Sequence, residues 1–222
     1  MTIAIADAIL NNLPYETALR KWGQNYPGSG YGNQFEHWLY SENPIPYNSC
    51  GNGSAMRVSP VGFAFDNLDR VLEEAKRTAE VTHNHPEGIK GAQAIAAAIF
   101  LARTGSTKLE IKAYISDKFQ YDLNRSVEEI RPVYRFDISC QGSVPEAIIC
   151  FLESSDYESC IRLSISIGGD SDTIACIAGG IAQAYYKFIP TYLVTIAREK
   201  LPEEMIGVLD EFEGIKNIVI YF

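Results

Sequence analysis

The segment that most restricts the fold is Gly91–Gly105, "GAQAIAAAIFLARTG", which is apolar on almost every side when it is wound into a helix. A helix of this kind lies inside a protein, because no face of it suits contact with water. We expect Gly105 to cap the C-terminus of this helix. The rest of the chain must therefore surround this helix, and we expect a mostly α-helical protein.

Several other segments have helical spacing of their apolar residues. Residues 2–22 predict a helix that Pro14 either breaks or restarts, and residues 23–55, rich in Gly, Pro, Asn and Tyr, predict mostly loop. Short strands are predicted near Tyr134–Ile138 and Ile218–Phe222. With 222 residues and no internal repeat, the chain suits a single domain over residues 1–222. The further predicted helices are 68–81, 108–121, 144–154, 171–188 and 202–212.

Composition excludes several classes of protein. The net charge is −9 and no cluster of Lys and Arg is present, which argues against a nucleic-acid partner. No apolar run is long enough to span a membrane, and the N-terminus does not resemble a signal peptide. Five cysteines without a CxxC motif are typical of reduced thiols. We therefore expect a cytoplasmic protein with no membrane partner.

The stretch "SIGGDSDTIA", Ser166–Ala175, places two carboxylates and two hydroxyls at the start of a predicted helix. Asp170 and Thr173 share a helical face, and Asp172 could reach the same point. These are hard oxygen ligands, which suit Mg²⁺, Mn²⁺ or Ca²⁺ better than zinc. Helix capping is the alternative, because Asp, Ser and Thr are favoured at N-termini. One cap residue is enough, however, so the excess of oxygen favours a metal site.

A second polar segment is "YNSCGNGSAMR", Tyr47–Arg57. Its Gly-Asn-Gly could turn backbone amides outward toward a phosphate, although Asn-Gly also marks ordinary turns. Arg57 could be the partner of an anion or a surface charge.

A third polar segment is "VTHNHPEGIKGA", which contains His83, His85 and Glu87. The His-x-His spacing suggests zinc, but His37 is the remaining imidazole and no complete ligand set is visible. A single histidine that donates a hydrogen bond to a substrate anion is the simpler interpretation.

Taken together and in this order, these segments resemble the ADP-ribosylglycohydrolase family, the group that includes the enzyme reactivating ADP-ribosylated dinitrogenase reductase. The last of them is the most specific, and together they extend along nearly the whole chain. The segments that carry the resemblance are "CGNGSAMRVSPVG" (Cys50–Gly62), "THNHPEGIKGAQA" (Thr82–Ala94), "QGSVPEAI" (Gln141–Ile148) and "GGDSDTIACIAGGIAQAYY" (Gly168–Tyr186).

The resemblance implies an all-α orthogonal helical bundle and a site in which two divalent cations, Mg²⁺ or Mn²⁺, hold ADP-ribose. It implies that Asp170, Asp172 and Thr173 are metal ligands and that His83 faces the bound ligand. It also implies that a loop lies along the diphosphate. The residues of that loop are Ser49, Cys50, Gly51, Asn52 and Gly53.

The function that the resemblance implies is Mg²⁺-dependent hydrolysis of the glycosidic bond between ADP-ribose and a protein side chain or a small conjugate. The family's upstream segment, with its acidic catalytic residue and its Thr-Asp-Asp-Thr metal motif, has no counterpart here. We therefore expect that the domain is N-terminally truncated, that Met1 is an internal methionine of a longer protein, and that the chain as given has little or no activity. We assign no catalytic residue. A smaller departure is Lys187, where the family usually has glycine, and we expect little consequence.

Two alternatives stay open. The chain could be a non-catalytic member of the family that binds ADP-ribose or serves structurally, having lost half of the metal site. It could also be a helical protein in which the motifs only cap helices. Binding of ADP-ribose without turnover distinguishes the first alternative, and failure to bind either ADP-ribose or metal distinguishes the second.

Overall fold

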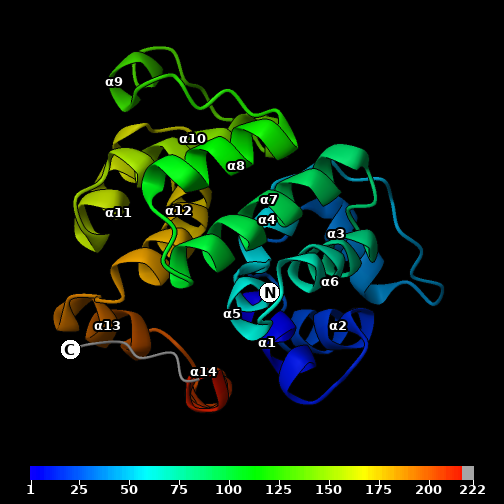
Figure 1. Ribbon diagram of the computed structural model, residues 1–222. Helices are drawn as coiled ribbons and strands as arrows, with labels where there is room; N and C mark the ends of the chain where they lie inside the picture. Colours follow the sequence, from blue (N-terminus) through cyan, green and yellow to red (C-terminus); the bar gives the residue numbers. More distant parts are fainter. Residues whose placement is uncertain (217–222) are drawn as a thin grey trace.

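A long apolar helix crosses the middle of the molecule, and the other helices pack around it (Figure 1). The computed structural model describes residues 1–216, in which there are fourteen helices and no strand. In chain order the helices are α1 (Thr2–Leu10), α2 (Tyr15–Asn25), α3 (Asn33–Tyr40), α4 (Gly53–Arg57), α5 (Ser59–Ala64), α6 (Leu68–Glu80), α7 (Pro86–Arg103), α8 (Lys108–Phe119), α9 (Val127–Ile130), α10 (Cys140–Glu153), α11 (Tyr157–Ser166), α12 (Ser171–Tyr186), α13 (Thr191–Glu199) and α14 (Glu203–Lys216).

The central helix is α7, which confirms the prediction made from the apolar segment Gly91–Gly105. It packs against α4, α5, α6, α8, α10 and α12. Its start is set by Pro86 in the first turn and by the side chain of His85, which accepts a hydrogen bond from the Glu87 amide. Gly105, with a φ of +96°, follows its end. Because α7 touches elements from both halves of the chain, it holds them in fixed positions around the site.

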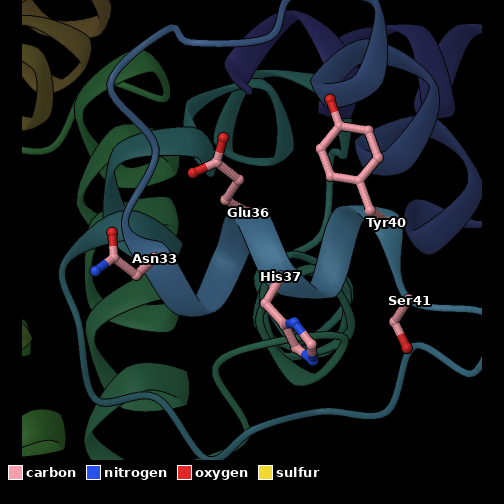
Figure 2. Close-up of a pocket in the computed structure, with 5 residues that line it drawn as sticks. All are labelled: Asn33, Glu36, His37, Tyr40 and Ser41. Atoms are coloured by element: carbon pink, nitrogen blue, oxygen red, sulfur yellow. The ribbon is translucent and has the colours of Figure 1, made fainter.

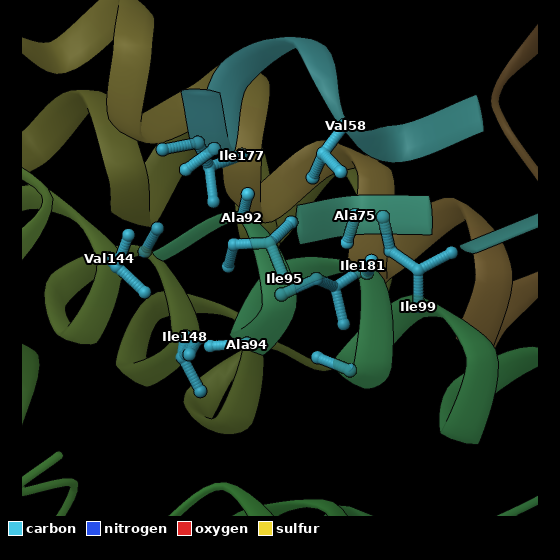
Figure 3. Close-up of a cluster of buried hydrophobic side chains, with 14 of the residues drawn as sticks. Val58, Ala75, Ala92, Ala94, Ile95, Ile99, Val144, Ile148, Ile177 and Ile181 are labelled. Carbon is cyan, nitrogen blue, oxygen red and sulfur yellow. The ribbon is translucent and has the colours of Figure 1, made fainter. Parts of the chain in front are cut away.

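The core is built where α7 meets α5, α6, α10 and α12 (Figure 3). Ile95, Ile99, Ile148 and Ile181 are fully or almost fully buried there. Such burial stabilises the folded state by about 1.5–3 kcal/mol for each side chain of this size.

Small residues let these helices approach closely. A methyl group on Gly62 of α5 would lie 2.6 Å from Cβ of Ile99, and one on Gly180 of α12 would lie 3.3 Å from Cδ1 of the same isoleucine. The glycines of α5 and α12 therefore allow both helices to pack directly on α7.

Most of the predicted helices are present. The N-terminal helix is divided into α1 and α2, with Pro14 at the N-cap of α2. The helices predicted at 68–81, 108–121, 144–154, 171–188 and 202–212 correspond to α6, α8, α10, α12 and α14. Helix α12 ends at Lys187, whose backbone is left-handed with a φ of +58°.

Other predictions were wrong. Residues 23–55 are mostly loop, as predicted, but they also contain the unpredicted α3, an amphipathic helix that buries Phe35, Trp38 and Leu39. Helices α11 and α13 were not predicted either. Tyr134–Ile138 is irregular rather than a strand, and the residues described make only one isolated antiparallel bridge, between Gly51 and Ser139. The strand predicted at Ile218–Phe222 lies outside the described residues. Within residues 1–216, no helix has the length and apolar character needed to cross a membrane.

Candidate functional site

The oxygen-rich segment forms a sharp turn between α11 and α12. Gly168 and Gly169 both have positive φ angles, +77° and +61°, which glycine adopts without steric cost. A methyl group on Gly169 would lie 2.6 Å from the ring of Tyr134. The turn is therefore shaped by its backbone and held by an aromatic side chain, and it places Asp170 at the start of α12.

Asp170 does not cap α12 with its side chain. Its Oδ2 instead accepts a hydrogen bond of 2.7 Å from the Asn52 amide, and the residue is only 8% exposed. A buried carboxylate that faces another helix, rather than its own first turn, has a role other than capping. The capping alternative therefore does not describe this residue.

Asn52 joins three helix starts. Its Nδ2 donates to Asp170 at the start of α12 and to Oγ of Ser143 in the first turns of α10, at 2.9 Å. Ser143 in turn donates to the Asp137 carbonyl at 3.1 Å. Asn52 is itself the N-cap residue of α4. The side-chain amide thus fixes the relative positions of segments that are far apart in the sequence.

The Ser49–Gly53 loop lies against His83. A methyl group on Gly53 would come within 3.2 Å of the His83 Nε2 atom, and one on Gly51 within 3.5 Å. Neither glycine has a positive φ, so both are required for space rather than for a special backbone conformation. The structure thus brings His83 to the loop, and Asn52 ties the loop to Asp170.

Two amides of this loop already have partners inside the protein. The Gly51 amide donates to Oγ of Ser49, and the Asn52 amide donates to the Ile138 carbonyl at 2.8 Å. These two amides are therefore not free to bind an anion, whereas His83 Nε2 lies close to Gly51 and Gly53 and could supply a donor. Cys50 is half-buried, and its carbonyl accepts from the Cys140 amide.

His83 is buried, with 6% of its surface exposed. Burial, and secondarily the nearby charge of Arg57, lowers the pKa of His83 to about 3. The ring is therefore neutral at physiological pH, with one nitrogen that donates and one that accepts. Its Nδ1 lies 2.7 Å from Oγ1 of Thr82.

Arg57 is not a surface charge, which corrects one of the two sequence interpretations. It is 2% exposed, and its Nη2 donates to the Thr78 carbonyl at 2.6 Å and to Oγ1 of Thr82 at 2.8 Å. Burial lowers its pKa to about 10, so the side chain remains a cation at neutral pH. Through Thr82 it is linked to Nδ1 of His83, whose Nε2 lies beside Gly53.

The remaining histidines have other positions. His85 caps α7, and His37 lies on α3 beside a cavity of about 340 Å³ with Asn33 and Ser41. Figure 2 shows His37 on the side of α3 opposite to Glu36 and Tyr40. Across residues 1–216, no group of three or more His, Cys, Asp or Glu side chains could hold a metal ion. The zinc interpretation thus has no ligand set in this part of the chain.

The oxygen atoms at the start of α12 could supply some, but not all, of the ligands of a hard cation. Asp170 and Thr173 are buried, and Asp172 is exposed. Within residues 1–216, Thr173 Oγ1 donates only to the thioether of Met56, at 3.4 Å, and a thioether is a weak acceptor. Two carboxylates and one hydroxyl would suit Mg²⁺ with several bound waters, because Mg²⁺ keeps much of its hydration in proteins.

The structure also shows site residues that the sequence interpretation did not single out. Ser143 and Thr82 lie inside the segments "QGSVPEAI" and "THNHPEG". The sequence therefore indicated the segments, but it did not indicate which contacts these two residues make. Tyr134, which packs on Gly169, lies where a strand was predicted, and no local pattern indicates its role.

The described part of the chain is thus an all-α bundle whose polar site lies where the starts of α4, α10 and α12 meet beside a buried histidine. A structural neighbour titled "ADP-ribosylglycohydrolase-related protein complex" has the same fold, with a TM-score of 0.73 and 22% identity over 97% of this chain and 79% of that one. The family model described as ADP-ribosylglycohydrolase matches residues 1–218. The chain belongs to this family.

Two relatives illustrate the sequence similarity. The chain is 28% identical to the ADP-ribosylhydrolase ARH3 of Danio rerio, covering 84% of this chain and 68% of that protein. It is 26% identical to the ADP-ribosylarginine hydrolase Tri1 of Pseudomonas putida, covering 84% of this chain and 57% of that protein. It spans 50% of the length of three mammalian proteins that carry the ARH3 name.

Proposed function

We propose that this chain binds ADP-ribose between the Ser49–Gly53 loop, His83 and the start of α12, and that it serves hydrolysis of the bond between ADP-ribose and a protein side chain or a small conjugate. Family membership supports the class of ligand, since the relatives are named for hydrolysis of ADP-ribosyl linkages. The observation that carries the proposal is the Asn52–Asp170 hydrogen bond, because it joins the loop to the oxygen cluster in one polar site.

Within this proposal, Asp170, Asp172 and Thr173 hold Mg²⁺ or Mn²⁺. When bound, the metal orients the ribose hydroxyls and lowers the pKa of a bound water. The Asn52 amide holds one oxygen of Asp170 and so orients the carboxylate. His83, with its ring uncharged, donates a hydrogen bond to the diphosphate. Binding the remote diphosphate helps to position the ribose for reaction.

The test is calorimetric titration of the purified chain with ADP-ribose, with and without Mg²⁺, followed by an assay for release of ADP-ribose from an ADP-ribosylated protein. We expect ADP-ribose to bind and Mg²⁺ to tighten the binding. Asp156→Ala should bind ADP-ribose as the original chain does, because Asp156 only caps α11. Its carboxylate accepts a hydrogen bond from the Ser159 amide. An affinity that is unmeasurable in both conditions would contradict the proposal.

The metal ligands are tested separately by titration with Mn²⁺. Asp172→Ala should abolish the binding of Mn²⁺ while the helix content is retained, because the exposed Asp172 side chain makes no hydrogen bond within residues 1–216 that the fold depends on. Asp156→Ala should bind Mn²⁺ as the original chain does. An unchanged Mn²⁺ affinity in Asp172→Ala would remove this carboxylate from the proposed metal site.

A second candidate function is binding of ADP-ribose without catalysis. The observation that favours it is that residues 1–216 contain no group of three metal-binding His, Cys, Asp or Glu side chains, and a two-metal mechanism needs both ions held firmly. Binding without turnover in the assay above would favour this candidate. For either function we propose a cytoplasmic location, because the five cysteines form no disulfide.

A further inference from the structure

A line of three polar side chains runs from the interior to the proposed binding site. Arg57 Nη2 donates to Oγ1 of Thr82 at 2.8 Å, and Oγ1 lies 2.7 Å from Nδ1 of His83. Arg57 and Thr82 are buried almost completely, at 2% and 0% exposure. In such surroundings a hydrogen bond between two polar groups is strongly favoured, because an unpaired polar atom is costly, although Arg57 Nε has no partner within residues 1–216.

The direction of each hydrogen bond follows from what each group can donate. A guanidinium group has no acceptor, so the Thr82 hydroxyl oxygen must accept from Arg57. The hydroxyl has one proton of its own, and Nδ1 of His83 lies within reach of it. If Thr82 donates this proton to Nδ1, then Nδ1 is the bare nitrogen of the neutral ring, and the ring proton is on Nε2.

The other end of the ring faces the loop. Nε2 lies beside Gly51 and Gly53, whose missing side chains leave it room, and it has no hydrogen-bond partner among the residues that the structure describes. A donor without a protein partner, at a loop that uses two of its own amides internally, is available to a ligand. The ring of Tyr47 lies beside the imidazole, with 6.1 Å between the ring centroids.

We propose that Arg57, acting through Thr82, holds His83 in the Nε2–H tautomer and so presents a neutral hydrogen-bond donor to the diphosphate of ADP-ribose. Arg57 is then a positioning residue that touches no ligand. The assignment of the ligand rests on the proposed function, whereas the tautomer does not. The competing arrangement has the Thr82 hydroxyl donate to the phenol oxygen of Tyr47, which would put the ring proton on Nδ1.

The tautomer is tested by nitrogen-15 NMR of the imidazole rings in the full chain, with His83→Gln used to assign the signals. We expect His83 to show the Nε2–H pattern, and Thr82→Val, which removes the hydroxyl at nearly constant size, to lose it. Thr82→Ser keeps the hydroxyl and should restore the pattern. A wild-type His83 in the Nδ1–H form, or an Nε2–H pattern that persists in Thr82→Val, would overturn the inference.

The consequence for binding is tested by titration with ADP-ribose. We expect Thr82→Val to weaken the affinity by about tenfold or more, as loss of a hydrogen bond to a charged group does, and Thr82→Ser to recover most of it. Ser164→Ala is the control, because its hydroxyl is equally buried, lies on α11 and donates to the Cys160 carbonyl. An equal loss in Ser164→Ala would overturn the positioning role. If the wild type shows the Nε2–H form but binds no ADP-ribose, the proposed function fails while the tautomer assignment stands.

Discussion

At the scale of single residues, burial decides the chemistry of this site more than residue type does. His83 and Arg57 are both basic, yet burial lowers the pKa of each, to about 3 for the histidine and about 10 for the arginine. The histidine therefore becomes a neutral donor and the arginine stays a cation. The sequence shows both residues, but whether each is buried depends on helices from other parts of the chain.

The pKa of His83 predicts a dependence of stability on pH. An unfolded chain binds a proton at this ring below about pH 6.5, and the folded chain does not until about pH 3, so the unfolded state gains protons as the pH falls. His83 should therefore lower the free energy of unfolding by about 2 kcal/mol between pH 7 and pH 5. Urea unfolding at both pH values measures this change.

The comparison that isolates His83 is between the wild type and His83→Gln, which should lose the decrease. His37→Gln removes an exposed histidine on α3 and should keep it. Identical pH dependence in all three proteins would mean that His83 is not buried as neutral imidazole.

At the scale of secondary-structure elements, the ends of helices show where sequence and structure agree. Ser126 and Thr107 start α9 and α8 with reciprocal capping boxes, and Asp156 starts α11 in the same way. Asp170 has the same residue type at the same position of α12 but makes no cap. Local sequence therefore marks where helices begin, and it does not distinguish a carboxylate that caps its own helix from one that bonds to another helix.

The backbone at the end of α12 is strained, and this strain can be tested. Lys187 has left-handed backbone angles, a φ of +58° and a ψ of 7°, which cost a residue with a Cβ about 1–2 kcal/mol and cost glycine little. Lys187→Gly should therefore raise the free energy of unfolding by about 0.5–1 kcal/mol, after allowance for the greater entropy of glycine in the unfolded chain. A thermal or urea melt measures this.

Lys187→Ala provides the control, because alanine keeps the Cβ and the strain. It should not be stabilised by comparison with the lysine. An equal gain in both variants would show that the lysine side chain, and not the backbone angle, is responsible.

At the scale of the whole molecule, the fold depends on close contacts between α7 and its neighbours. Gly62→Ala would place a methyl group 2.6 Å from Cβ of Ile99 and 2.9 Å from the Ala96 carbonyl. Since neither atom can move without moving α7, we expect the free energy of unfolding to fall by about 1–3 kcal/mol. Urea unfolding measures the change.

Gly207→Ala is the matched control for that substitution. Gly207 lies inside α14, and an added methyl group would meet no atom within 4 Å. Alanine is the better helix former, so this variant should be as stable as the wild type or more stable by up to about 1 kcal/mol. A similar loss in both variants would contradict the close-packing explanation.

Much of this architecture could be predicted from the sequence because it depends on local patterns. The apolar segment Gly91–Gly105 predicts the central helix, and the resemblance supplies the site motifs. Contacts between distant segments could not be predicted in this way. The hydrogen bond from Asn52 to Asp170 joins residues 118 positions apart, and nothing near either residue indicates its partner. Helix α3 was missed because its short apolar pattern lies between loops rich in glycine and asparagine.

The burial of α7 also determines which movements the protein can make without unfolding. The amides in the middle of α7 are covered on every side, so their hydrogens should exchange with solvent deuterium only when the whole protein opens. The glycine turn before Asp170 and the Ser49–Gly53 loop lie at the ends of helices, where opening is local. A ligand that joined the loop to the start of α12 should therefore slow exchange at these helix ends while leaving exchange in the middle of α7 unchanged.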